Sequence, residues 1–138
     1  AHIKQDDQGD VVEVGFSFNT RITNAGLVHL KGMTKLQSLS LPNQITGGEL
    51  VHLKGLTKLR NLDLGGSKVT DGGLVHLKGM TELSVLWLGG TKVTDAGLVH
   101  LKGLTKLQNL DLSFTQTTDA GVTDLQKSLP NCNILKDT

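Results

Sequence analysis

The sequence predicts an α/β solenoid, with a parallel sheet along one side and short helices along the other. Four similar segments begin at Ile22, Ile45, Val69 and Val93, with 23 residues between the first two starts and 24 between the later ones. Each segment carries a helix-start signal and then a run in which leucines alternate with other residues. Self-similarity at a period in this range is typical of solenoids, whose units bury their apolar faces only against their neighbours.

The N-terminal residues 1–21 are expected to form a hairpin-like cap over the first unit. Two strand-like runs flank a polar turn that contains Gly9, and the terminal unit of a solenoid needs such a cover. The aspartates of this turn lack the spacing of a calcium-binding loop, so a solvated turn is favoured. The run that contains Phe16 and Phe18 is one residue out of phase with the later units, so its register stays open.

Each unit then begins with a short helix, for which the fourth unit serves as the example. Thr94 or Asp95 can accept hydrogen bonds from the first helical turn, and the carboxylate also complements the positive end of the helix dipole. Leu98 and Leu101 share the face toward the core, and Gly103 suits the left-handed conformation that closes a helix. A helix of about two turns is marginal alone in water, so packing on the sheet must hold it.

A strand follows each helix. In the fourth unit Leu110 and Leu112 are expected to point inward and Asn109 and Asp111 outward, because side chains alternate along a strand. Neighbouring parallel strands lie about 4.8 Å apart, so equivalent residues of successive units form columns. Paired glycines such as Gly65-Gly66 follow two of the strands, where a sharp turn needs positive φ angles.

The phrase LxxLxLxxT followed by VTDAGLVHL resembles the leucine-rich repeat family. The resemblance is to a bacterial-type 24-residue subtype with units that read TDxGL, similar to the cysteine-containing or F-box type, and it covers residues 22–116 continuously. It implies a right-handed horseshoe with the parallel sheet on its concave side and short helices on its convex side. It also implies partner binding much more often than catalysis.

The expected organisation is one domain of 138 residues. It consists of the cap at 1–21, four full repeats at 22–116 and a C-terminal partial repeat at 117–138. In that last part, residues 117–128 look helical and residues 133–135 could add a short strand.

Composition excludes several classes of function. The 14 basic and 13 acidic residues give no general reason to expect nucleic acid or an anionic membrane as a partner. No apolar run approaches the roughly 18 residues of a membrane span, and the start shows no signal-peptide pattern. Cys132 is the only cysteine, so no internal disulfide is expected. We expect no cofactor, and the compartment and oligomeric state stay open.

Several columns of polar residues have structural interpretations. The histidines at one helical position are His29, His52, His76 and His100. Helices pack about 8–10 Å apart, whereas the ligands of one zinc ion must nearly touch, so half-buried packing is favoured over a metal site. The hydroxyl residues at the place of a turn-bonding asparagine are Ser67, Thr91 and Thr115.

Lysines form two further columns near the helix C-termini, where a cation complements the helix dipole. They are Lys31, Lys54, Lys78 and Lys102, then Lys35, Lys58 and Lys106. A basic stripe of this kind could also attract an anionic polymer.

The outward strand positions differ between units, and they are the candidate site. The expected ligand-binding residues are Ser40, Asn61, Asp63, Val85, Trp87, Asn109 and Asp111. Trp87 lies between two aspartates and is a typical anchor, and the carboxylates favour a protein or peptide with Lys or Arg. The alternatives are a carbohydrate stacked on the indole, or a repeat fragment with no function of its own.

No catalytic site is expected. Asp63 and Asp111 are two strand spacings apart, about 9.6 Å, which is close to the carboxylate separation of inverting glycosidases. However, Trp87 occupies the space between them, and an open sheet does not bury either carboxylate. The histidines lie on the helices and Cys132 at the far end, so no nucleophile and base share one face.

Overall fold

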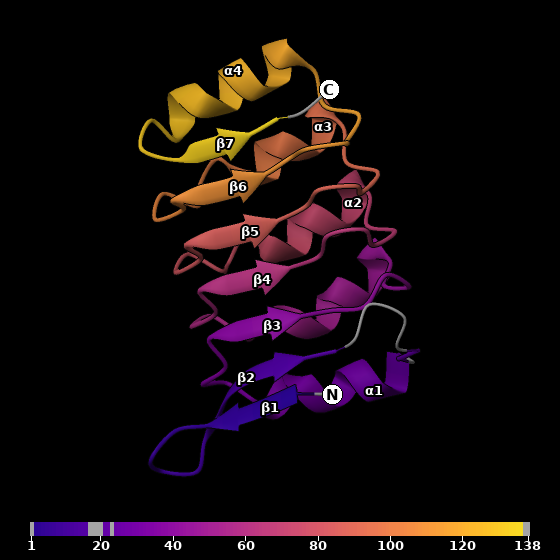
Figure 1. Ribbon diagram of the computed structural model, residues 1–138, viewed down its shortest axis with the longest axis vertical. Helices are drawn as coiled ribbons and strands as arrows, with labels where there is room; N and C mark the ends of the chain where they lie inside the picture. The colour runs from indigo at the N-terminus through magenta and orange to yellow at the C-terminus, as the bar shows by residue number, and fades with distance from the viewer. Residues whose placement is uncertain (1, 17–20, 23, 137–138) are drawn as a thin grey trace.

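The computed structural model describes residues 2–16, 21–22 and 24–136, and it confirms the predicted α/β solenoid. One sheet faces the viewer in Figure 1, with its strands stacked in chain order from the N-terminal end to the C-terminal end. Within the described residues its strands are β1 (His2–Gln5), β2 (Val11–Gly15), β3 (Ser38–Ser40), β4 (Asn61–Asp63), β5 (Val85–Trp87), β6 (Asn109–Asp111) and β7 (Asn133–Leu135).

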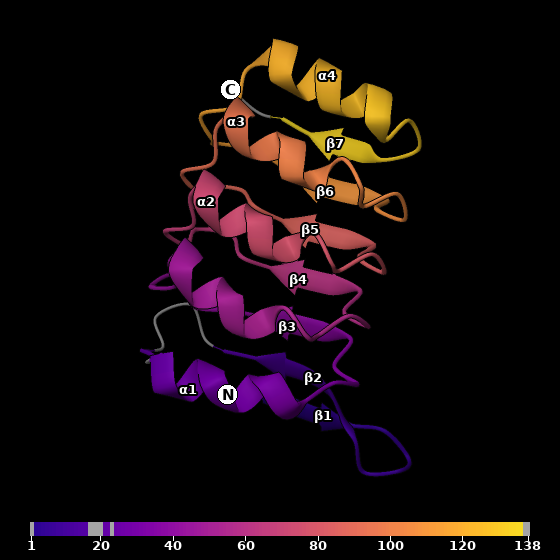
Figure 2. The same ribbon diagram turned by 180° about the vertical axis from the view of Figure 1, so that it is seen from behind.

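The helices stand behind the sheet, one set for each unit, as Figure 2 shows from the other side. They are α1 (Asn24–Val28), η1 (His29–Gly32), η2 (Gly47–Leu53), α2 (Asp71–Leu74), η3 (Val75–Leu77), α3 (Asp95–Leu98), η4 (Val99–Leu101) and α4 (Asp119–Ser128). The helical segments of the middle units thus end in a tight 3₁₀ turn. Gly103 does not take the left-handed conformation that we predicted, because η4 has already ended and Lys102 remains in the right-handed region.

Strand register resolves the phase of the N-terminal segment. β1 and β2 pair antiparallel, and Glu13 of β2 then pairs in parallel with Ser38 of β3. Ser38 pairs with Asn61, which pairs with Val85. The spacing is therefore 25 residues from β2 to β3, 23 to β4 and 24 to β5. Phe16 packs partly buried against the core, while Phe18 lies outside the described residues.

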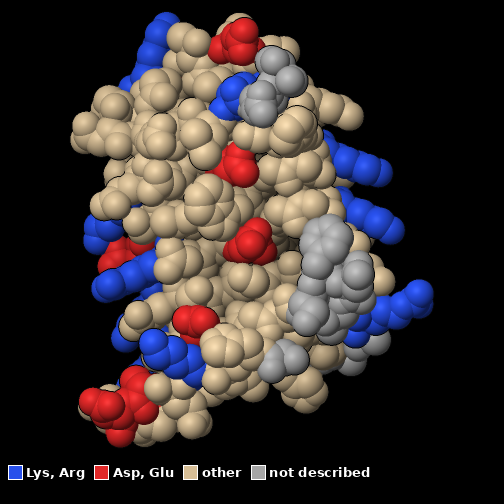
Figure 3. Space-filling model, in the orientation of Figure 1, with Lys and Arg blue, Asp and Glu red and all other residues tan. Residues whose placement is uncertain are grey.

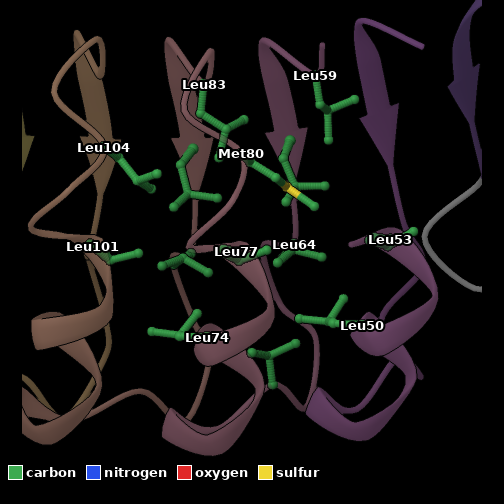
Figure 4. Packing of buried hydrophobic residues seen from close by; sticks show 14 of the residues in the cluster. Leu50, Leu53, Leu59, Leu64, Leu74, Leu77, Met80, Leu83, Leu101 and Leu104 are labelled. Atoms are coloured by element: carbon green, nitrogen blue, oxygen red, sulfur yellow. The ribbon is translucent and has the colours of Figure 1, made fainter. Parts of the chain in front are cut away.

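The core is a stack of leucine layers. The middle residue of each strand from β3 to β6 is buried, as is Val14 of β2, and Leu110 and Leu112 point inward as predicted. Figure 4 shows leucines of the helical segments, such as Leu74 and Leu77, in the same layer as leucines that flank the strands, such as Leu64 and Leu83. Each fully buried leucine contributes about 1.5–3 kcal/mol, so three-residue strands and two-turn helices are held by their neighbours.

Aspartates at the helix starts connect neighbouring units. The Asp71 carboxylate accepts hydrogen bonds from the Thr94 backbone N–H at 2.7 Å and from the Thr94 hydroxyl at 2.5 Å. Thr94 caps its own helix, since its hydroxyl oxygen accepts from the Ala96 N–H at 3.3 Å. Of the two predicted capping residues, Thr94 is therefore the one that caps the helix, and the Asp95 carboxylate instead accepts from Thr118 of the next unit, at 2.8 and 2.6 Å.

This connection explains a glycine in the repeat. A Cβ atom at Gly97 would lie 2.4 Å from Asp71 Oδ1, and a Cβ atom at Gly121 would lie 2.1 Å from Asp95 Oδ1. Real Cβ atoms do not approach oxygen so closely. The aspartate of one unit therefore requires glycine two residues after the aspartate of the next.

Candidate binding surface on the sheet

The sheet face away from the helices, called the sheet face below, carries the seven predicted ligand-binding residues in two adjoining rows. Ser40, Asp63, Trp87 and Asp111 are register partners in succession, and Asn61, Val85 and Asn109 form the parallel row beside them. Trp87 is 36% exposed, while Leu86 and Leu88 on either side are fully buried. The predicted alternation of β5 is therefore correct, and a one-residue slip that would bury Trp87 is excluded.

A shallow hollow lies at the carboxyl ends of β4, β5 and β6. It has a volume of about 520 Å³. Its lining residues are Asp63, Gly65, Trp87, Gly89, Gly90, Asp111, Ser113 and Phe114. Three of the seven predicted residues line it, and the other four lie on the strands beside it. Most of the lining comes from the turns that follow the strands, of which only the paired glycines were discussed above, as turn formers.

The two carboxylates of the hollow are partly used by the scaffold. Asp63 Oδ1 accepts a hydrogen bond from the Gly65 N–H at 2.9 Å, and Asp111 Oδ1 accepts one from the Ser113 N–H, also at 2.9 Å. Each aspartate thus fixes the turn after its strand. Asp111 also leans over the neighbouring unit, because a Cβ atom at Gly89 would lie 2.7 Å from its Oδ2.

No ion pair between described residues neutralises the negative charge of these aspartates. Among the described residues, the ion pairs are His2–Glu13, Lys35–Asp10, Lys102–Asp124 and Lys106–Glu82, and none involves Asp63 or Asp111. In Figure 3 acidic side chains follow the middle of the sheet face, and most of the basic side chains lie at its two margins. The hollow therefore combines an aromatic surface with uncompensated negative charge.

Phe114 is the aromatic lining residue that the sequence-based prediction missed. It is 70% exposed and has a φ of 58°, in the left-handed region. The equivalent residues of the two preceding units are Gly66 and Gly90, with φ of 71° and 73°. A left-handed conformation costs a residue with a side chain about 1–2 kcal/mol. The available signal was the change from the Gly-Gly pair of those units to Ser113-Phe114 at the same place.

The histidine column lies on the helical side, away from the hollow. His52, His76 and His100 are half-buried with their Nδ1 atoms enclosed, whereas His29 is exposed. Burial lowers the pKa of His76, and the nearby Lys54 charge lowers it further. No group of three residues that could hold a metal ion occurs among the described histidines, cysteines and carboxylates.

Two residues of the hydroxyl column form hydrogen bonds to the backbone of their own units. Thr91 and Thr115 donate to the carbonyl groups of Leu88 and Leu112, each at 2.7 Å. Ser67, in the same column, is buried.

A second hollow, of about 440 Å³, lies at the opposite ends of the strands. Arg60, Glu82 and Lys106 contribute its charges. Glu82 is paired with Lys106, and the hydrogen bond from that ammonium group holds the pKa of Glu82 below its usual value. Because Lys106 and Glu82 neutralise each other and leave only the charge of Arg60, the hollow beside Trp87, with two aspartates and no cation, is the stronger candidate.

Solved structures share this arrangement of strands and helices. An internalin C2 from Listeria monocytogenes str. 4b F2365 matches with a TM-score of 0.67 and 31% identity over 80% of this chain. An internalin, InlF, from the same strain matches with a TM-score of 0.64 and 20% identity over 96%. The PEPR1–AtPEP1 crystal structure matches with a TM-score of 0.60 and 21% identity over 97%. The fold is the leucine-rich repeat solenoid.

The leucine-rich repeat chain spans only part of these proteins, 46% of each internalin and 19% of PEPR1. No protein-family model and no curated protein matches it. Within the described part of the leucine-rich repeat chain, no helix has the length and apolar character needed to cross a bilayer.

Proposed function

We propose that this leucine-rich repeat domain is a non-catalytic module that binds a protein or peptide on its sheet face, centred on Trp87. The observation that carries the proposal is an exposed tryptophan between two carboxylates that have no counter-ion among the described residues. Large aromatic side chains on open surfaces are typical binding anchors. The leucine-rich repeat neighbours, internalins and PEPR1, support a protein-binding role for the fold.

The charge of the surface determines the class of partner. Asp63 and Asp111 each keep one carboxylate oxygen, Oδ2, outside the turn hydrogen bonds. A partner with Lys or Arg side chains would neutralise them and make cation–π contact with the Trp87 ring. Ser40, Asn61, Val85 and Asn109 would contact the partner along the strands.

Two further assignments belong to the same proposal. The TDxGL subtype is supported by the role of its aspartate and glycine, which meet across units at Asp71 and Gly97. A single domain over residues 1–138 is supported by one hydrophobic core that extends from Val14 to Cys132.

A catalytic role is disfavoured by the same geometry. Trp87 stands between Asp63 and Asp111 in the register of the sheet, so the two carboxylates do not face each other across a free space. Both carboxylates also hold turns, and a general acid or base must be free to exchange protons with a substrate.

The test is affinity capture with the wild-type domain and the Trp87→Ala variant in parallel, with a glycan array on the same two proteins. Val99→Ala is the matched control, since Val99 is 54% exposed on the helical side. We expect a protein or peptide that the wild type and Val99→Ala retain and that Trp87→Ala loses. Retention of every captured partner by Trp87→Ala contradicts the proposal, and glycan binding that depends on Trp87 would replace it with the carbohydrate alternative.

A further inference from the structure

We propose that Phe114 is the second aromatic anchor of this surface, and that Trp87 and Phe114 together bind an arginine side chain of the partner in the hollow that they line. This inference deepens the proposed function and depends on it. It names a residue, a side-chain chemistry and a peptide partner for the hollow.

Phe114 lies outside the described hydrophobic core. Its ring is 70% exposed and does not belong to the core or to the side chains packed against it. Its backbone has a φ of 58°, at a turn position that glycine occupies in the two preceding units. The chain therefore holds a bulky residue in a conformation that favours glycine, without burying it. Strain of this kind is typically stored at binding sites.

The charge of the lining residues favours a cationic ligand. Its eight lining residues include two aspartates and no lysine or arginine. Within the described part of the chain, neither Asp63 nor Asp111 takes part in an ion pair. Aromatic faces attract cations through the ring quadrupole, so rings and carboxylates favour the same ligand.

The guanidinium group of arginine suits this hollow better than the ammonium group of lysine. A guanidinium group is planar and weakly hydrated, so its face can lie on an aromatic ring while its edge donates to carboxylates. The Oδ1 atoms of Asp63 and Asp111 are engaged by the turns, which leaves Oδ2 of each as the acceptor. Because Trp87 lies between the two aspartates, a guanidinium stacked on its ring can donate from its edge to Oδ2 of one of them, while the other adds to the negative charge of the hollow. The backbone of a bound peptide can extend from the hollow over the adjoining row of Asn61, Val85 and Asn109.

The experiment uses the fluorescence of Trp87, which is the only tryptophan of the chain. The probes are acetyl-Gly-Arg-Gly-amide, its lysine counterpart and its citrulline counterpart, which keeps the shape of arginine without the charge. We expect a saturable change with the arginine probe, a weaker affinity for lysine and no response to citrulline. Phe114→Gly should lower the affinity for the arginine probe by about fivefold or more. The Tm of this variant should not fall, because glycine suits this φ.

The Val99→Ala variant serves as the control and should bind the arginine probe like the wild type. Absence of a response to arginine, an equal response to citrulline or lysine, or unchanged affinity in Phe114→Gly would overturn the inference. A marked fall in the Tm of Phe114→Gly would also overturn it, because Phe114 would then support the scaffold. If Trp87→Ala loses a captured partner that Phe114→Gly retains, the arginine site fails while the proposed function stands.

Discussion

Asp71 binds both the backbone N–H and the hydroxyl group of Thr94, which lies one unit further along the chain. The same pair of bonds joins Asp95 to Thr118. A carboxylate at the start of one helix therefore fixes the chain that leads into the next helix. This connection lies on the helical side of the solenoid, while the ladder of backbone hydrogen bonds joins the same units on the other side.

The Asp95 connection should make stability depend on acid pH. Hydrogen bonds from Thr118 lower the pKa of Asp95 from its ordinary value of 3.8. The stabilisation is therefore complete above about pH 4 and is lost as the pH falls through the lower pKa of the folded state. We expect Asp95→Asn to unfold at a lower urea concentration than the wild type at pH 7 and to approach it near pH 2. Parallel curves for the two proteins across this range would show that the bonds contribute nothing.

The glycine opposite the carboxylate should be intolerant of alanine. Gly97→Ala would place Cβ 2.4 Å from Asp71 Oδ1 and 3.1 Å from its Cα, so backbone must move, at a cost of about 1–3 kcal/mol. Gly103→Ala is the matched control, since nothing lies within 4 Å of its added Cβ. Its unfolding free energy should stay within about 0.5 kcal/mol of the wild type or rise. Equal costs for the two variants would contradict the packing explanation.

Alternation along β5 should separate stability from binding. Leu86→Ala and Leu88→Ala each remove a fully buried side chain and should cost about 2–5 kcal/mol in chemical denaturation. Trp87→Ala leaves no core cavity and should cost less than about 1 kcal/mol. The same variant should nevertheless lower the affinity for the true partner by about 2 kcal/mol or more, roughly 30-fold. Collapse of the Trp87→Ala fold would show that the indole is structural.

His76 should oppose folding at mildly acidic pH. Burial and the Lys54 charge lower its pKa, so the unfolded chain binds a proton near pH 6.5 while the folded chain still resists it. Stability is then complete above about pH 6.5 and falls as the pH drops toward the pKa of the folded state. We expect thermal unfolding of His76→Leu to change less between about pH 7 and pH 5 than that of the wild type. An identical pH dependence would exclude His76 as the cause.

Salt should weaken the binding of a cationic partner. The attraction between Asp63, Asp111 and a Lys- or Arg-bearing peptide is screened when salt rises from about 0.05 M to about 0.5 M, so Kd should increase severalfold. The Asp63→Asn, Asp111→Asn double variant should bind more weakly at low salt and lose most of this dependence. Calorimetric titration of a captured peptide measures both. Affinity that salt does not change would instead indicate a neutral ligand such as a sugar.

The period of the sequence was sufficient to predict the solenoid, the inward leucines and the position of Trp87 between two aspartates. Contacts that depend on stacking were not accessible in this way. The partner of Asp71 lies 23 residues away, and only the packing of one unit on the next brings Thr94 to it. Likewise, the pattern of outward residues did not indicate that Asp63 and Asp111 each accept a hydrogen bond from the turn after their own strand. The positive φ of Phe114 follows from the turn shape that its unit shares with Gly66 and Gly90.

The register of the sheet has a consequence for how this chain tolerates change in length. The interval from β2 to β3 exceeds 24 residues by one and the next interval falls short by one, yet the register partners Val14, Leu39 and Leu62 all point inward. Each connecting arch therefore absorbs an insertion or deletion locally, and the ladder beyond it is unaffected. The same change inside a three-residue strand would exchange leucine for aspartate at the core. During evolution, the arches can therefore change in length. The strands keep their register, and the exposed residues on them can be substituted.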